Sequence, residues 1–168
     1  NRTAPKHNRP TKDYKRYNVE LEKTNDFRRN IAEHSMLDVF GSGWTPDLIG
    51  YRGQPQPFDQ KYTTLMKYKF NVIILPAIAN DYIDEKILDS FLTLTVPVVL
   101  GPDTLNDYFP EDAFIKINNF SDIDSLFEFL SNISNKEYEN YIEQIRNERM
   151  RIFKDFSTKN NQAKLIYD

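Results

Sequence analysis

The segment that follows the apolar run at residues 70–75 carries the groups best suited to binding an anionic ligand. It contains Asn80, Tyr82, Glu85 and Lys86. Lys86 stands near an expected helix start, where backbone N–H groups attract phosphate, and its ammonium adds positive charge there. A glutamate can accept hydrogen bonds from sugar hydroxyls, and a tyrosine ring can stack on a base or donate its O–H. The segment therefore indicates a site for a phosphorylated ligand.

The same segment also has a purely structural interpretation. Asp84 suits the N-cap position of the predicted helix, and Glu85 is a favourable charge in its first turn. Tyr82 could act as a hydrophobic staple before the helix. Spacing alone does not separate this interpretation from the binding one.

Arg28 and Arg29 form a second candidate set, near the end of a predicted helix. A guanidinium group can bind phosphate through two parallel hydrogen bonds. Adjacent helix positions point in different directions, so at most one of the two arginines easily faces a cleft. The alternative is a solvated, charged helix face.

The turn at Gly41 and Gly43 is the third candidate. Its glycines could let the backbone approach a ligand closely, or could simply form a turn. The sequence holds neither G-x-G-x-x-G opening a helix nor the Walker sequence G-x-x-x-x-G-K-[ST]. It therefore predicts no dinucleotide fingerprint and no P-loop.

Composition excludes several kinds of site. The 168 residues include no cysteine, and His7 and His34 are the only histidines. This excludes a disulfide scaffold and a thiolate metal site, and it argues against a catalytic triad or a multi-histidine metal site. The net charge of −3 gives no reason to expect nucleic-acid binding. We therefore expect no nucleic-acid partner. Because no apolar run reaches the roughly 18 residues of a membrane helix, we also expect no transmembrane segment in this chain.

The hydrophobic pattern predicts alternating strands and helices. Such alternation favours an α/β fold, in which helices cover both faces of a parallel sheet and ligands bind beyond the carboxyl ends of the strands. Ser121, with Asp124 three residues later, resembles a capping box. We expect strands at residues 37–40, 70–75, 96–100 and 113–117, a long loop at 44–60, and helices at 17–34, 61–68, 84–94, from 121 and at 135–156.

Residues 68–120 resemble the C-terminal half of the α-1,3/4-fucosyltransferases, glycosyltransferase family 10. The order and the spacing of the family motifs hold throughout this stretch. The matching segments are YKFN (68–71), YIDEK (82–86), TVPVVLG (95–101), FPEDAFI (109–115) and NF (119–120), with a weaker match at DVFGSGW (38–44).

The resemblance implies a GT-B architecture, in which two Rossmann-like domains hold the active site between them. Residues 16–134 would be the nucleotide-sugar-binding domain, preceded by a flexible basic arm at residues 1–15. Residues 135–168 would form a long helix and tail that can pack back across to the other domain.

The resemblance also implies inverting transfer of fucose from GDP-fucose to a glycan acceptor, with no required cofactor. The catalytic base would be a glutamate of an N-terminal, acceptor-binding domain that this chain lacks. No catalytic residue is therefore assigned here, and the chain alone would bind donor without turnover. The acceptor, the oligomeric state and the compartment (cytoplasmic, membrane-associated or Golgi lumen) stay open.

Site residues follow from the same resemblance. It implies that Arg29 and Lys86 contact the diphosphate, and that Tyr82 and Glu85 contact the nucleotide or the sugar. Further candidates for the donor site are Arg28, Asn80, Asp84 and Gly43.

Two departures from the family pattern bear on the donor. Residues 74–77 (ILPA) stand in place of F-E-N-S, so a carboxylate and an amide are replaced by apolar atoms. Asp84 stands in place of a threonine, and its charge weakens diphosphate binding unless Lys86 or a cation offsets it. One alternative to binding by Lys86 alone is that Asp81 and Asp84 hold Mn²⁺ or Mg²⁺ against the diphosphate. The donor could also be a different nucleotide sugar. Two alternatives to an active enzyme domain are a non-catalytic glycosyltransferase-like module and a flavodoxin-like partner-binding domain.

Overall fold

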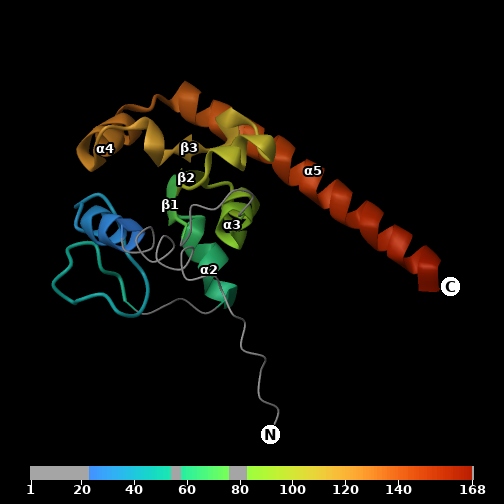
Figure 1. Cartoon of the computed structure of the whole chain (residues 1–168), viewed down its shortest axis with the longest axis horizontal. Coiled ribbons are helices and arrows are strands. Elements are labelled where there is room, and N and C mark those ends of the chain that lie inside the picture. Colours follow the sequence, from blue (N-terminus) through green and yellow to red (C-terminus); the bar gives the residue numbers. More distant parts are fainter. Residues whose placement is uncertain (1–22, 54–57, 76–82, 168) are drawn as a thin grey trace, which may run out of the picture.

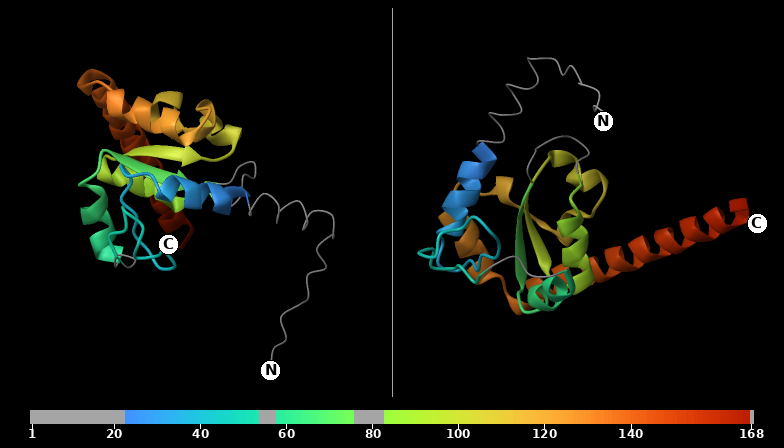
Figure 2. Two further views of the ribbon diagram at one scale, coloured as in Figure 1. Left: turned by 90° about the vertical axis from the view of Figure 1, so that its left-hand side faces the viewer. Right: turned by 90° about the horizontal axis from the view of Figure 1, so that it is seen from below.

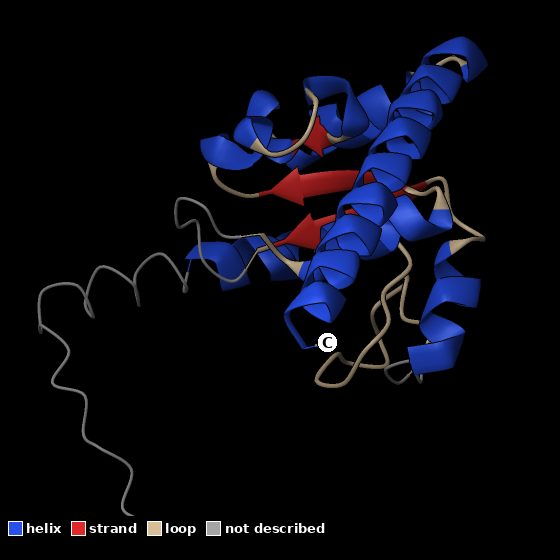
Figure 3. Ribbon diagram, turned by 90° about the vertical axis from the view of Figure 1, so that its right-hand side faces the viewer, coloured by secondary structure: helices blue, strands red, loops and turns tan. Residues whose placement is uncertain are grey.

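The structure, a computed structural model, describes residues 23–53, 58–75 and 83–167. The predicted arm at residues 1–15 lies outside these ranges. The sheet has three parallel strands in the order β1-β2-β3. They are β1 (Phe70–Ile74), β2 (Val96–Leu100) and β3 (Ile115–Lys116), and Figure 3 shows β1 and β2 pointing in the same direction.

The central strand is buried on both faces. Val96, Val98 and Val99 of β2 are each at most 1% exposed, as expected for a parallel strand covered on two sides. β1 forms one edge of the described sheet, and most of its side chains are half-buried. These two strands confirm the predictions at residues 96–100 and 70–75, whereas β3 is shorter than the predicted 113–117. Its flanking residues belong instead to 3-10 helices, η2 (Glu111–Ala113) and η3 (Ile117–Asn119).

Helices cover both faces of the sheet, which confirms the predicted α/β layering. Figure 2 shows the helix at residues 23–32 on one side of the strands and α3 on the other. Side chains from these helices meet in one core, which includes Ile31, Phe91, Leu126 and Ile145. The labelled helices are α2 (Phe58–Leu65), α3 (Glu85–Thr93), α4 (Ile123–Asn132) and α5 (Asn135–Tyr167).

The segment at residues 37–40 is not a strand of the sheet, so that prediction was wrong. Val39 makes only an isolated bridge to Tyr51, because its backbone bonds to residues 50 and 52 and not to a strand of the sheet. The chain then turns at Gly41, which adopts a positive φ of 133°. Asp38 accepts a hydrogen bond from Tyr68 (2.8 Å) and pairs with Arg52 (2.7 Å). These contacts tie the loop to the chain just before β1. The predicted long loop ends sooner than expected, since α2 begins at Phe58.

The carboxyl ends of β1 and β2 are packed tightly around a glycine. Leu75 N donates a hydrogen bond to Leu100 O at 3.0 Å. A Cβ atom on Gly101 would lie 2.9 Å from Leu75 Cδ1 and 3.1 Å from Leu105 Cδ1. This close approach explains why glycine follows β2.

The C-terminal helices differ from their predictions at the boundaries. Asp122, and not Ser121, caps α4, because its carboxylate accepts a hydrogen bond from Ser125 N. α5 is longer than predicted, and Figure 1 shows its C-terminal part projecting away from the sheet. Its Ile142 and Ile145 are buried. Among the described residues, no helix combines the length and the apolar character needed to cross a bilayer.

Candidate functional site

Arg28 reaches the carboxyl end of β1. Its Nη2 donates to Ile74 O (3.1 Å), the backbone carbonyl of the last residue of the strand, and its Nη1 donates to Asn25 Oδ1 (2.8 Å). The guanidinium is part-buried between the helix at residues 23–32 and the sheet edge. It is therefore a fixed positive charge at the edge where an α/β sheet binds ligands.

Arg29 points elsewhere. Its Nη1 pairs with Asp26 Oδ1 at 3.1 Å, within the same helix, and both side chains are about 70% exposed (71% and 69%). The structure thus bears out the expectation that adjacent arginines diverge, and it is Arg28 that contacts the sheet. The diphosphate role inferred for Arg29 stays a prediction.

The first turn of α3 lies at the same sheet edge as Arg28, because α3 is the crossover between the parallel strands β1 and β2. Asp84 caps this helix in an extended conformation, and its Oδ1 accepts a hydrogen bond from Lys86 N (2.9 Å). Its backbone carbonyl accepts another from Ile87 N (3.1 Å). The structural interpretation of Asp84 as the N-cap is therefore confirmed.

The ammonium of Lys86 folds back onto the same carboxylate. Nζ lies 2.8 Å from Asp84 Oδ1 and 3.1 Å from Oδ2, and 3.5 Å from Glu85 Oε1. The Asp84 side chain is only 5% exposed, whereas those of Lys86 and Glu85 are 49% and 72% exposed. Lys86 is thus accessible from solvent but already holds an internal anion.

The ion pair shifts the pKa of both partners. Burial alone would raise the pKa of the Asp84 carboxyl, but the hydrogen bonds and the charge of Lys86 outweigh it and the net shift is downward. Burial alone would lower the pKa of Lys86, but the hydrogen bonds and charges of Asp84 and Glu85 outweigh it and the net shift is upward. Each group therefore stabilises the charged form of the other.

No described contact brings the other predicted site residues to the carboxyl end of β1. Asn80, Tyr82 and the proposed metal ligand Asp81 lie outside the described residues. Gly43 adopts a positive φ of 86°, in the loop that is tied to the chain before β1, at the opposite end of that strand. Within the described ranges, no group of three or more His, Cys, Asp or Glu is arranged to hold a metal ion.

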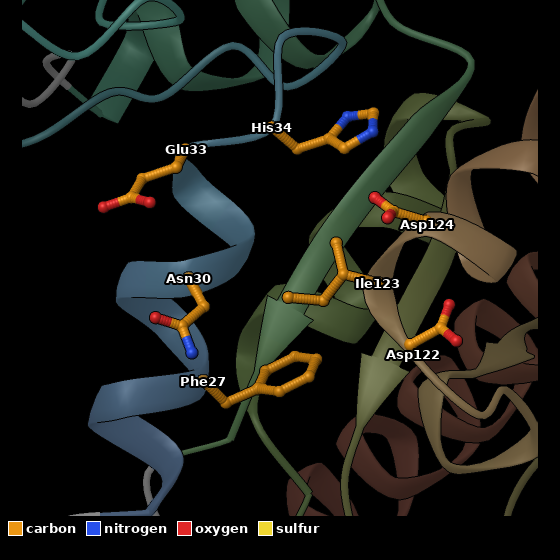
Figure 4. Close-up of a pocket in the computed structure, with 7 residues that line it drawn as sticks. All are labelled: Phe27, Asn30, Glu33, His34, Asp122, Ile123 and Asp124. Carbon is orange, nitrogen blue, oxygen red and sulfur yellow. The ribbon is translucent and has the colours of Figure 1, made fainter.

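A groove that the sequence does not predict lies between the helix at residues 23–32 and the start of α4 (Figure 4). Its volume is about 540 Å³. At its side, the ring of His34 stacks on Phe127 with centroids 3.7 Å apart. The charged residues lining it are all acidic, which suits a diphosphate poorly. Its lining is Phe27, Asn30, Glu33, His34, Asp122, Ile123 and Asp124.

Solved structures define the class to which the fold belongs. The crystal structure of an alpha1,3-fucosyltransferase with GDP-fucose aligns with 73% of this chain and 35% of that chain, at a TM-score of 0.55 and 22% sequence identity. The structure with GDP aligns with a TM-score of 0.55, 21% identity, and coverage of 72% and 34%. The chain is thus a Rossmann-like α/β half of a GT-B glycosyltransferase fold.

Sequence comparison then gives the family. Residues 14–165 match the profile "Glycosyltransferase family 10 (fucosyltransferase) C-term", and this chain belongs to that family. It is 30% identical over 131 residues to alpha-(1,3)-fucosyltransferase 7 of Homo sapiens, covering 76% of this chain and 36% of that protein. It is 35% identical over 103 residues to alpha-(1,3)-fucosyltransferase 4 of Bos taurus, covering 60% and 24%. The chain thus spans about a third or less of the length of these relatives.

Proposed function

We propose that this chain is the donor-binding domain of an inverting fucosyltransferase-like enzyme, which transfers fucose from GDP-fucose to a glycan acceptor. The family match over residues 14–165 carries the proposal. Solved relatives of the same fold hold GDP and GDP-fucose. In this proposal, a carboxylate of an N-terminal, acceptor-binding domain deprotonates the acceptor hydroxyl.

The cationic groups at the carboxyl edge of β1 would stabilise the departing GDP. Lys86 stands in the first turn of α3, and Arg28 contacts the last residue of β1. Arg29 stays a candidate for the same role, as Tyr82 and Glu85 do for nucleotide and sugar contacts. Neither cation needs a metal ion to act in this way, and Mn²⁺ or Mg²⁺ at Asp81 and Asp84 remains the alternative arrangement.

A second candidate function is a non-catalytic module that keeps the fold without efficient donor binding. Two observations favour it. Apolar residues occupy the segment 74–77, where the family carries F-E-N-S. In addition, Arg28 and Lys86 already donate to acceptors of the protein itself.

Calorimetry with GDP, GDP-fucose, GDP-mannose and UDP-sugars, each with and without Mn²⁺, separates the two functions. The donor-binding function predicts that GDP ligands bind in preference to UDP ligands. Lys86→Ala should weaken GDP binding by about tenfold or more, because it removes a charge-assisted contact. The matched control is Lys67→Ala, which removes an exposed lysine from the turn after α2.

The outcomes differ clearly. Equal or absent binding of all four ligands would contradict the assignment of GDP-fucose as donor and favour the non-catalytic module. Loss of affinity in both lysine variants would show a general charge effect and not a contact of Lys86. A requirement for Mn²⁺ would favour the metal-assisted arrangement.

A further inference from the structure

Asp84 binds two N–H groups in the first turn of α3 as well as a side chain of that turn. The Asp84 side chain accepts a hydrogen bond from Lys86 N (2.9 Å), and its backbone carbonyl accepts one from Ile87 N (3.1 Å). Both carboxylate oxygens also accept hydrogen bonds from the ammonium of Lys86 (2.8 and 3.1 Å). A phosphate bound at a helix start uses the same kinds of donor. The carboxylate of Asp84 therefore stands where phosphate oxygens would be received.

The carboxylate of Asp84 is buried, whereas about half of the Lys86 side chain is exposed. The Asp84 side chain is 5% exposed and that of Lys86 is 49% exposed. A buried carboxylate that receives three hydrogen bonds has little reason to move. Lys86 can turn to solvent only by leaving a partner that would then be a buried, less compensated charge. The ion pair therefore opposes the reorientation that a diphosphate needs.

We propose that Asp84 is an affinity-determining residue: an internal anion that competes with the donor diphosphate for the ammonium of Lys86. The inference rests on the proposed function for the identity of the ligand. A protein whose binding-competent state is a minor fraction shows an affinity reduced by that fraction. Removing the charge of Asp84 while keeping its cap should therefore raise affinity.

The test uses Asp84→Asn, because asparagine is as good an N-cap as aspartate but carries no charge. The matched control is Asp122→Asn, which removes one negative charge from the start of α4. Calorimetry with inorganic pyrophosphate and with GDP measures affinity, and circular dichroism checks the fold. Asp84→Ser serves as a second variant, since serine also caps helices.

We expect Asp84→Asn to bind both ligands about tenfold more tightly than the unchanged chain, with Asp122→Asn unchanged. Adding Lys86→Ala should abolish the gain. Equal or weaker binding by folded Asp84→Asn and Asp84→Ser would overturn the inference, as would an equal gain in Asp122→Asn or a gain that survives Lys86→Ala.

The two proposals fail in different ways. If the unchanged chain binds GDP selectively and the Asp84 variants bind it no better, the inference is wrong and the donor-binding function stands. If the Asp84 variants gain affinity for pyrophosphate but no variant prefers GDP to UDP, the donor assignment fails and Asp84 still competes for a diphosphate. If no variant binds pyrophosphate or GDP, both are wrong.

Discussion

The starts of α3 and α4 use the same capping residue in different surroundings. Asp84 caps α3 from a buried position and receives the backbone N–H and the ammonium of Lys86. Asp122 caps α4 from an exposed position and receives Ser125 N (2.7 Å) and the Ser121 hydroxyl (3.0 Å). One carboxylate is neutralised by a cation, whereas the donors to the other, among the residues that the structure describes, are uncharged.

This difference shows that an N-cap can determine more than where a helix begins. At α4, satisfying Asp122 uses hydroxyl and amide groups, and no cation is committed. At α3, satisfying Asp84 commits the cation that the proposed function assigns to the diphosphate. If the proposed function holds, the donor affinity of the chain would therefore depend on the stability of the ion pair between Asp84 and Lys86, whereas no such dependence would arise from Asp122.

The largest expected effect is on folding stability. Asp84→Ala removes the cap of α3 and leaves Lys86 without its main partner, so we expect the free energy of unfolding to fall by about 2 kcal/mol. Asp122→Ala should cost less, because solvent replaces an exposed cap more easily. Guanidinium unfolding followed by circular dichroism measures both. Equal losses would contradict the distinction between a buried, charge-paired cap and an exposed one.

The dependence of stability on pH should separate the two helix starts further. The folded-state pKa of Asp84 is lowered, so its stabilisation is present above the unfolded value of about 3.9 and is lost as pH falls through the folded value. The folded-state pKa of Lys86 is raised, so its stabilisation is present below about 10.4 and is lost as pH rises through the folded value. Asp122 also has a lowered pKa, because hydrogen bonds from Ser125 and Ser121 favour its carboxylate.

Thermal unfolding across acid and alkaline pH tests this difference. The gap in Tm between the unchanged chain and Asp84→Asn should narrow at both extremes, below about pH 4 and above about pH 10. The gap for Asp122→Asn should narrow only on the acid side, since no lysine within the described ranges pairs with Asp122. If the Tm gap for Asp122→Asn also narrowed at alkaline pH, or if that for Asp84→Asn did not, the two caps would not differ in the way proposed.

The elements around the site could be predicted from sequence, because local chemistry decides them. The apolar runs at residues 70–75 and 96–100 allow little except buried parallel strands, and Asp84 is a strong cap before an amphipathic helix. The cap of α4 was placed one residue early, because Ser121 and Asp122 are both good caps and only the backbone conformation selects between them. The strand predicted at 37–40 failed because its pairing depends on tertiary contacts.

The arrangement of the site was less predictable. Which of Arg28 and Arg29 contacts β1 depends on the rotation of their helix against the sheet, and sequence does not specify that rotation. The return of Lys86 to Asp84 joins residues two apart, which helix periodicity alone does not bring together. The groove beside His34 and Asp124 joins segments far apart in the chain, so no local motif could indicate it.

The smallest predicted effect concerns a reciprocal bond that α4 makes and α3 does not. Asp122 N donates to Ser125 Oγ at 3.3 Å, which completes a capping box. α3 cannot make this bond, because Ile87 occupies the equivalent position. Ser125→Ala should therefore lower the free energy of unfolding by about 0.5 kcal/mol, measured by guanidinium unfolding. A loss as large as that of Asp84→Ala would mean that the reciprocal hydroxyl bond of α4 is worth as much as the ion-paired cap of α3, and burial with Lys86 would then not be what distinguishes α3.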